Sequence, residues 1–461
     1  MHMDQTSNKP DAAALRRARI LGGPLFRTLL SLGITTIAVL IAQTFVGVLE
    51  TWYLSFLGTD SLVGASLVFP ISMLMTMMSN GGIGGGVASA VARAIGAGKR
   101  READALVLHA VVVAVVLGCL FTILAWCYGP ELYAALGGRG PGLAAAVTYS
   151  NYVFAGAIPV WIVNLLCAAL RGSGNVKVPA ITTFAGALVL IPLSPLLIFG
   201  IGAVPGLGIA GAGIAVSLYY SIAAVALLVY MASGHAGLIL TRAPLNRRFF
   251  SDILRVGALS SVGALQLNLM VVLLTAVVGH FGQAALAGYG IASRLDYVLI
   301  PLLFGLGTAV LTVVGTCMGA GDIARARRAT WLGIAMGAGF TQIIGLVVAI
   351  HPPVWLALFT HDTAATHFGS LYLRTIAPLY GLVGVSFILS FAAQGIGRPF
   401  WTILGGTARL LIAVGGGWLA VNQLGGGMGT LSAFVAAGTI GSALVCAATM
   451  VPKRIWTRVE V

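Results

Sequence analysis

Charged residues are scarce in this chain. Lys, Arg, Asp and Glu make up 8% of its 461 residues, whereas they make up about 25% of an ordinary soluble domain. Hydrophobic residues make up 59% of the chain, which leaves no room for a separate soluble domain. The composition therefore excludes a soluble multidomain protein and indicates an integral membrane protein.

Sequence motifs of catalysis and of metal binding are also missing. The five cysteines form no CxxC pair and lie within or beside apolar runs, as small buried hydrophobic residues do. The pattern HExxH and paired aspartate motifs are absent, and residues 206–211 fit GxGxxG without the strand and acidic residue that a dinucleotide site requires. We therefore expect no enzyme activity, no catalytic residue, no metal site and no cofactor.

The basic residues are distributed as in a membrane protein. The net charge of +14 would suggest a nucleic-acid partner if the charges shared one surface, but they lie in clusters between apolar runs. Along the chain, basic segments alternate with loops that have almost no basic residues. The tails and loops on one side of the membrane hold nineteen basic residues, and the loops on the other side hold one, Arg139. The nineteen are Lys9, Arg16, Arg17, Arg19, Lys99, Arg100, Arg101, Arg171, Lys177, Arg242, Arg247, Arg248, Arg325, Arg327, Arg328, Arg398, Lys453, Arg454 and Arg458. Because basic loops stay in the cytoplasm, we expect a multi-pass protein of the bacterial inner membrane with both termini cytoplasmic and no nucleic-acid partner.

Twelve apolar runs are long enough to cross a bilayer, which takes about 20 residues of helix. They lie near 27–57, 61–92, 104–128, 143–170, 178–201, 207–233, 251–281, 284–317, 329–352, 366–394, 399–422 and 428–451. The sequence thus predicts an all-α integral membrane protein of about twelve transmembrane helices. Its expected parts are a cytoplasmic N-terminal tail (1–24), an N-lobe (25–233), a cytoplasmic inter-lobe linker (234–250), a C-lobe (251–452) and a cytoplasmic C-terminal tail (453–461).

The two halves of the chain repeat each other. Ile95-Gly-Ala-Gly corresponds to Met318-Gly-Ala-Gly, Ala169-Leu-Arg-Gly to Ala392-Ala-Gln-Gly, and Tyr149 to Tyr372, and all three pairs share one offset along the chain. Six helices per half, an even number, insert both halves the same way up. We therefore expect two pseudo-symmetric six-helix lobes, related by an axis along the membrane normal, with the substrate path between them.

Two of the twelve acidic residues, Glu50 and Asp296, lie well inside apolar runs. A carboxylate at the bilayer centre costs about 2.5–3.5 kcal/mol, so each of them needs a structural or functional reason. For Asp296 we favour a structural ion pair, because Arg294 and Arg409 are candidate partners. For Glu50 we favour a group that binds and releases the coupling ion, because the C-lobe has Leu274 at the equivalent position.

At these residues the chain resembles the multidrug and toxic compound extrusion (MATE) family of the MOP superfamily, over roughly residues 25–450. The matching segments are 43–58, 92–98 (Ala-Arg-Ala-Ile-Gly-Ala-Gly), 170–175 (Leu-Arg-Gly-Ser-Gly-Asn), 195–200, 206–213, 287–294 and 315–321. Each segment is weakly specific by itself, but their order, spacing and duplication are strongly specific. The resemblance implies a cation-coupled antiporter that exports amphipathic organic compounds, often cationic, by alternating access.

The resemblance also assigns site residues. The family's first-helix aspartate falls on Glu50, its second amino-lobe aspartate falls on Ser194, and an asparagine one turn earlier falls on Leu190. The further polar residues of these sites are Gln43 and Asn164 in the N-lobe and Gln266 and Asn268 in the C-lobe. This pattern is closer to the DinF-like branch. Because Na⁺ needs several hard oxygen ligands and the N-lobe has lost an acid and an amide, we favour H⁺ over Na⁺ as the coupling ion.

One alternative within transport is a flippase of lipid-linked oligosaccharides, a class of related architecture. Such a flippase would bind a pyrophosphate with cationic side chains, for which Arg294, Arg374 and Arg409 are candidates. We interpret Arg171 as a loop residue or a residue that sets the topology. The expected partners are a small organic substrate and membrane lipids, and a monomer is expected.

Cysteine labelling tests the predicted orientation. In a variant without native cysteines, we expect an impermeant thiol reagent added from outside to label Arg139→Cys but not Arg247→Cys, because only position 139 lies in an outer loop. Labelling of both positions in permeabilised membranes is the control for thiol reactivity. The converse pattern in intact cells would show that the helix count or the orientation is wrong.

Overall fold

The computed structural model describes residues 12–201, 204–241, 243–450 and 453–456, which are nearly all helical. The first half contains α1 (Ala12–Gly22), α2 (Leu25–Ser55), α3 (Thr59–Met77), η1 (Met78–Gly82), α4 (Ile83–Gly96), α5 (Arg100–Ala135), α6 (Gly140–Ala155), α7 (Ala157–Gly172), α8 (Lys177–Phe199), β1 (Gly200–Ile201), β2 (Val204–Pro205) and α9 (Ile209–Ala232). The second half contains α10 (Arg247–Gly279), α11 (Gln283–Ala320), α12 (Ile323–Ile350), α13 (Pro353–Leu356), α14 (Thr363–Ile376), η2 (Ala377–Leu379), α15 (Tyr380–Ile396), α16 (Phe400–Leu410), η3 (Leu411–Gly416), α17 (Gly417–Leu424), α18 (Met428–Met450) and η4 (Lys453–Trp456).

The predicted membrane spans are present as helices. Within the described residues, 11 helices are long and apolar enough to cross a membrane, or 12 if the bent pair α6 and α7 counts as one span. That pair bends by 48° at Gly156, and the equivalent span of the second half is interrupted by η2 at the corresponding position. The prediction of an all-α membrane protein with about twelve helices is confirmed.

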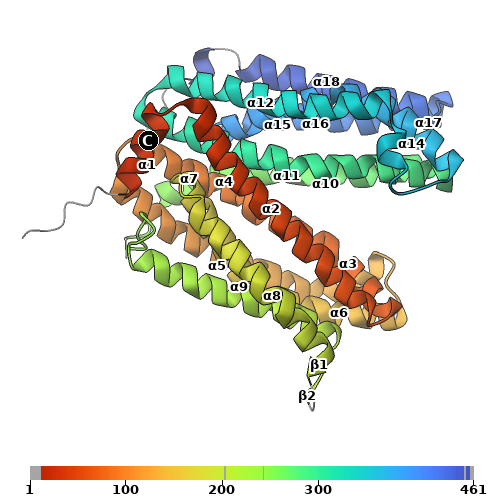
Figure 1. The fold of residues 1–461 in the computed structure, drawn as a ribbon, viewed down its shortest axis with the longest axis horizontal. Helices are drawn as coiled ribbons and strands as arrows, with labels where there is room; N and C mark the ends of the chain where they lie inside the picture. Colours follow the sequence, from red (N-terminus) through yellow and green to blue (C-terminus); the bar gives the residue numbers. More distant parts are fainter. Residues whose placement is uncertain (1–11, 202–203, 242, 451–452, 457–461) are drawn as a thin grey trace, which may run out of the picture.

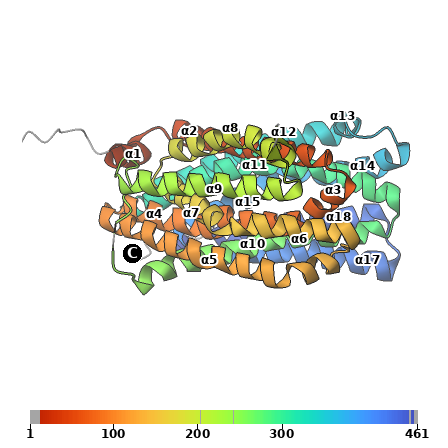
Figure 2. The ribbon, with the colours of Figure 1, turned by 90° about the horizontal axis from the view of Figure 1, so that it is seen from below.

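The helices form two lobes that meet at one end of the molecule and separate toward the other. Figure 1 shows the lobes joined at the end that carries α1, with α2 running diagonally between them. Figure 2 shows the long helices of both lobes lying along the same axis. The N-lobe has one large apolar core, which includes Tyr133, Phe154 and Trp161, and the C-lobe has its own clusters of buried residues. The prediction of two lobes is therefore confirmed.

The repeat is visible in the backbone. Gly58 and Gly282 both precede a long helix, and both have φ of 95°. A side chain is disfavoured in this left-handed region, which glycine adopts without steric cost. Glu50 and Leu274 are separated by the same offset as these two glycines, so their pairing also holds in the structure.

The first helix of each half packs against the opposite lobe before it joins its own. Leu29 and Leu32 of α2 belong to a C-lobe cluster, whereas Ile253 of α10 belongs to the N-lobe core. Gly33 in α2 faces Leu306 of α11, and the equivalent Gly257 in α10 faces Ile83 of α4. The expected division at residue 251 therefore describes the sequence repeat, but the first half of α2 and of α10 lies across the lobe boundary.

The two lobes touch through their backbones at the closed end. A Cβ atom added at Gly96 would clash with the carbonyl oxygen of Thr316, and one added at Gly319 would clash with that of Arg93. These two contacts are equivalent under the internal repeat. Small residues allow such close helix crossings, so Gly96 and Gly319 permit the close contact between α4 and α11.

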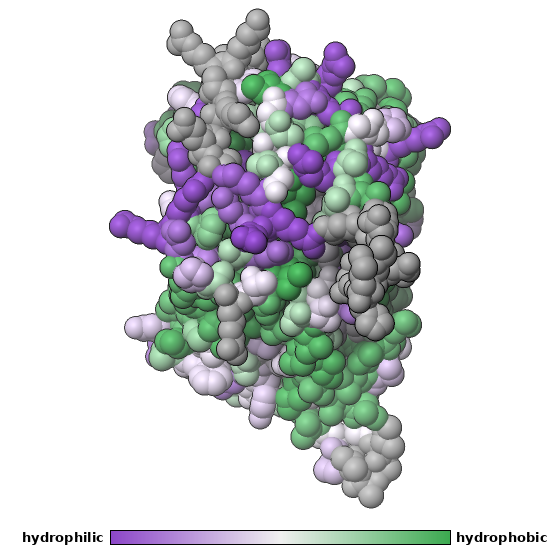
Figure 3. Space-filling model, turned by 90° about the vertical axis from the view of Figure 1, so that its left-hand side faces the viewer, coloured by the Kyte–Doolittle hydropathy of each residue, from purple (hydrophilic) through white to green (hydrophobic). Residues whose placement is uncertain are grey.

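The closed end is also the basic end. Figure 3 shows hydrophilic residues gathered across this end of the molecule. Residues 12–22 of the expected tail form α1, which lies across both lobes: Arg17 donates to the Gly96 carbonyl at 2.9 Å, and Arg325 donates to the Ile20 carbonyl at 3.0 Å. Lys9, Arg242 and Arg458 of the basic clusters lie outside the described residues.

Candidate functional site

Glu50 lies five residues before the C-terminal end of α2, toward the end where the lobes separate. Its carboxylate Oε1 accepts a hydrogen bond from Ser194 Oγ of α8 at 2.8 Å. One turn further, the Tyr53 hydroxyl donates to the Ile191 carbonyl at 3.1 Å. That carbonyl is free to accept because Pro195, four residues later, has no N–H to donate. The end of α2 is therefore attached to α8 by two polar contacts.

The carboxyl group of Glu50 has no basic partner within the described part of the chain. No Lys, Arg or His nitrogen there lies within ion-pair distance of it. The titratable groups that interact with it are the hydroxyls of Tyr149 and Tyr220. A charged carboxylate without a cation is costly in a membrane, so this arrangement suits a group that is neutral for part of a cycle.

Gln43 and Asn164 line a small cavity to which Glu50 does not contribute, and all of its lining except Phe304 comes from the first half of the chain. Asn164 donates to Ser79 Oγ at 2.8 Å, and Gln43 lies seven residues before Glu50 on α2. The cavity holds about 20 Å³, which is room for about one water molecule. Its lining comprises Thr36, Val39, Leu40, Gln43, Asn80, Val163, Asn164, Cys167, Arg171, Pro179, Thr183, Tyr219, Tyr220 and Phe304. Of the N-lobe residues assigned to the Glu50 site, only Ser194 contacts it among the described residues.

The interpretation of Arg171 as a loop residue is wrong. Arg171 lies in the last turn of α7, is 8% exposed and lines the same cavity. Its guanidinium donates to Asn80 Oδ1 at 3.3 Å, and no carboxylate lies within ion-pair distance in the described structure. The sequence did not reveal this, because a basic residue near a helix end normally extends into water.

Asp296 lies in a C-lobe cluster with one of its two candidate partners. The expected ion pair is not formed, because no arginine nitrogen lies within ion-pair distance of the Asp296 carboxyl among the described residues. Arg409 is the cation that influences this carboxyl from beyond that distance, and the hydroxyls of Tyr372 and Tyr380 lie nearby. Arg294 is exposed, and its guanidinium carbon lies 5.6 Å from the centroid of the Phe359 ring. Each lobe thus has one intramembrane acid near an equivalent tyrosine, since Tyr149 and Tyr372 correspond in the repeat. The two acids differ because Asp296 has a cation, Arg409, nearby, whereas Glu50 has none among the described residues.

The C-lobe amides do not form one polar site. Gln266 Nε2 donates to Thr407 Oγ1 of α16 at 2.8 Å, within the C-lobe. Asn268 Nδ2 instead donates to Met77 Sδ of α3 at 3.0 Å, across to the N-lobe. Both groups therefore have contacts that stabilise helix packing.

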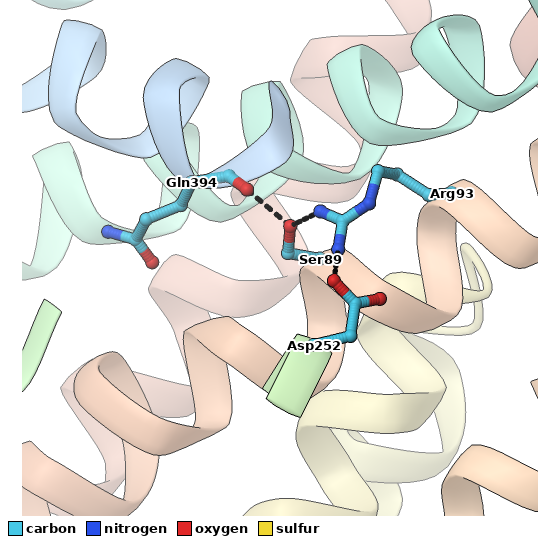
Figure 4. Close-up of polar contacts among 4 residues, drawn as sticks. All are labelled: Ser89, Arg93, Asp252 and Gln394. Carbon is cyan, nitrogen blue, oxygen red and sulfur yellow. Dashed lines mark hydrogen bonds and ion pairs between the residues drawn. The ribbon is translucent and has the colours of Figure 1, made fainter. Parts of the chain in front are cut away.

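One polar cluster at the lobe contact was not predicted. Arg93 of α4 binds Asp252 of α10, and Ser89 of α4 donates to the backbone carbonyl of Gln394 in α15 (Figure 4). Asp252 is not one of the two acids that lie well inside apolar runs. The sequence could have predicted this ion pair. Arg93 directly follows an apolar run, and an arginine that is buried there needs an anionic partner.

Comparison with known proteins identifies the family. The MatE family model matches residues 36–196 and 260–419. Each matched range lies within one half of the chain, and their starts are separated by the same offset as Gly58 and Gly282. A FAD transporter of Shewanella oneidensis is 27% identical over 86% of this chain and 88% of its own length. The multidrug export protein MepA of Staphylococcus aureus is 23% identical over 83% of this chain and 85% of its own length.

Solved structures have the same fold. A crystal structure of MATE in complex with MaD3S superimposes with a TM-score of 0.85 at 24% identity, covering 95% of this chain and 98% of that one. An outward-facing multidrug resistance MATE family transporter of the MOP superfamily has a TM-score of 0.84 at 23% identity, covering 95% of this chain and 97% of that one. Together with the family match over both halves, these likenesses show that the chain belongs to the MATE family of multi-pass membrane transporters.

Proposed function

We propose that the protein is a cation-coupled antiporter, with H⁺ favoured over Na⁺, that exports amphipathic organic compounds by alternating access. Relatives named as multidrug export proteins support an organic substrate. If the basic end faces the cytoplasm, as its charge predicts, the lobes meet at the cytoplasmic end and separate toward the outside in the described state. One chain contains both lobes, so we propose that a monomer is sufficient for transport.

Glu50 is the proposed site of the coupling ion. The observation that carries this proposal is a carboxylate bound to a Ser194 hydroxyl, with no basic partner among the described residues. A proton needs a single basic oxygen, whereas hard metal cations are held by several oxygen ligands. The amides of Gln43 and Asn164, which could supply more oxygens, lie in the separate cavity. This arrangement supports H⁺.

Protonation of Glu50 would act on a helix that connects the two lobes. The start of α2 packs on α11 of the C-lobe, and its end is attached to α8 of the N-lobe through Glu50 and Tyr53. Loss of the charge would weaken the charge-assisted bond to Ser194 and remove the carboxylate's demand for solvent. The first helix could then bend or repack and bring the separated ends of the lobes closer together. This couples proton binding to substrate release.

We expect Glu50→Gln to fold normally but to lose efflux driven by a pH difference and to release no protons when substrate binds in detergent. Glutamine resembles the protonated acid and cannot titrate. Glu50→Asp keeps the charge but withdraws it by one methylene, so partial activity is expected. Efflux from cells with matched expression, and proton release from purified protein, are the measurements. Efflux by Glu50→Gln equal to that of the wild type would contradict the mechanism.

Asp296 is proposed to have a mainly structural role, because Arg409 can balance its charge. We expect Asp296→Asn to lower the thermal stability of the purified protein while transport per folded molecule is retained. Arg294→Gln, which removes an exposed charge from the same helix, is the matched control. Full loss of transport by Asp296→Asn with unchanged stability would place the coupling site in the C-lobe instead.

Export of a phosphate-bearing organic anion is a second candidate function. A relative is named as a FAD transporter, and the buried Arg171 lines a cavity together with three side-chain amides. An arginine without a carboxylate partner suits recognition of phosphate. The alternative of a pyrophosphate-linked lipid substrate would require the same chemistry.

We expect Arg171→Gln to reduce FAD transport into inverted vesicles selectively if this second function is correct. Transport of a cationic dye by the same vesicles is the control, because a cation gains nothing from the guanidinium. Equal loss of both substrates would show that Arg171 stabilises the lobe junction rather than binding substrate.

A further inference from the structure

One ion pair joins the lobes at the closed end of the molecule. The Arg93 guanidinium of α4 lies 2.5 Å from Asp252 Oδ1 of α10, and the two side chains are 3% and 36% exposed. Arg93 also donates to Ser89 Oγ, which in turn donates to the Gln394 carbonyl of α15 (Figure 4). The N-lobe helix α4 is therefore bound to two C-lobe helices through one buried guanidinium.

Most of this interface follows the internal repeat. The bond from Ser89 to the Gln394 carbonyl has a counterpart in the bond from Thr312 to the Arg171 carbonyl at 3.1 Å, and each residue has its equivalent at the offset that relates Tyr149 to Tyr372. The contacts of the Gly-Ala-Gly segments in α4 and α11 are paired in the same way. Such duplicated contacts are expected where two copies of the same repeated half pack against each other.

The ion pair departs from the repeat. The residue equivalent to Arg93 is Thr316, and the one equivalent to Asp252, at the offset that relates Gly257 to Gly33, is Thr28. No second ion pair crosses the lobe interface in the described part of the chain. The contact between the lobes is otherwise symmetric, and the ion pair has no counterpart in it. The packing of the lobes therefore does not require the ion pair.

The pair must break if the lobes separate at this end. The guanidinium of Arg93 lies beside Gly397 of the C-lobe, and the backbone carbonyl of Arg93 lies against Gly319. Separation would therefore pull Arg93 away from all of its C-lobe contacts at once. Because Asp252 is partly exposed, water can already reach it and hydrate the carboxylate as the pair opens. A pair buried on both sides would lack this route and would open less readily.

We propose that Arg93 and Asp252 form an inter-lobe latch, which stabilises the state closed at the basic end and is broken and remade in each cycle. The proposal rests on the alternating access proposed above. In this role both are positioning residues, since they set the balance between two states. Removing one partner favours the open state, because the remaining charge can then be hydrated.

The test measures distances across both ends of the protein in detergent, without substrate or a pH difference. Spin labels at Arg101 and Arg328 report on the basic end, and labels at Thr59 and His361 report on the other end. All four residues are exposed. For Asp252→Asn, we expect the distribution of spin-label distances at the basic end to gain a main component at longer distance. At the other end, we expect the distances to become shorter. This readout does not depend on the identity of substrate or coupling ion, so it can fail or succeed separately from the proposed function.

Glu102→Gln is the matched control. It also removes one negative charge from an ion pair, but its partner Lys99 lies three residues away in the same lobe, at 3.2 Å. We expect its distances to equal those of the wild type. Ser89→Ala provides a second variant if Asp252→Asn does not fold, and a smaller shift in the same direction is expected. Wild-type distances in a folded latch variant, with reduced thermal stability alone, would overturn the proposal.

Discussion

The close contact between α4 and α11 is the constraint on which the rest of the structure depends. At Gly96 and Gly319 the backbone of one lobe lies directly against that of the other, and a side chain at either position would force them apart. This contact fixes where the lobes meet, and hence which end of the molecule is closed. The separation of the helices toward the other end, and the packing of the starts of α2 and α10 on the opposite lobe, accompany this contact.

Two kinds of interaction occur where the lobes meet: contacts that the repeat duplicates, and charged groups that it does not. Glycine contacts and backbone hydrogen bonds are duplicated by the repeat, so they act equally on both lobes and allow a close, smooth crossing. Several charged groups instead have no charged counterpart in the repeat: Arg93 with Asp252 at the closed end, Arg171 in the small cavity, and Glu50 near the end of α2. In the mechanism proposed above, the symmetric packing is the contact about which the lobes move, and the charges that lack counterparts in the repeat bias that movement.

The helix α2 connects these charges to the movement of the lobes. It starts within a C-lobe cluster, passes the cavity that holds Gln43 and Arg171, and ends at the bonds from Ser194 and Tyr53. A change in protonation at one end of a continuous helix can thus alter the packing at its other end. Asp296 differs from Glu50 in having Arg409 nearby, beyond ion-pair distance, and this difference is the basis of the separate roles proposed for the two acids.

The sequence by itself determined the spans, the two lobes, the family and the pairing of Glu50 with Leu274, because hydropathy, charge asymmetry and a repeat are properties of the chain alone. Only the tertiary structure decided which polar groups meet. Ser194 joined Glu50, whereas Gln43 and Asn164 did not, and Arg171 and Arg93 entered the interior. These contacts join residues between 91 and 159 positions apart, from helices whose relative rotation is set by side-chain packing and cannot be read from local periodicity.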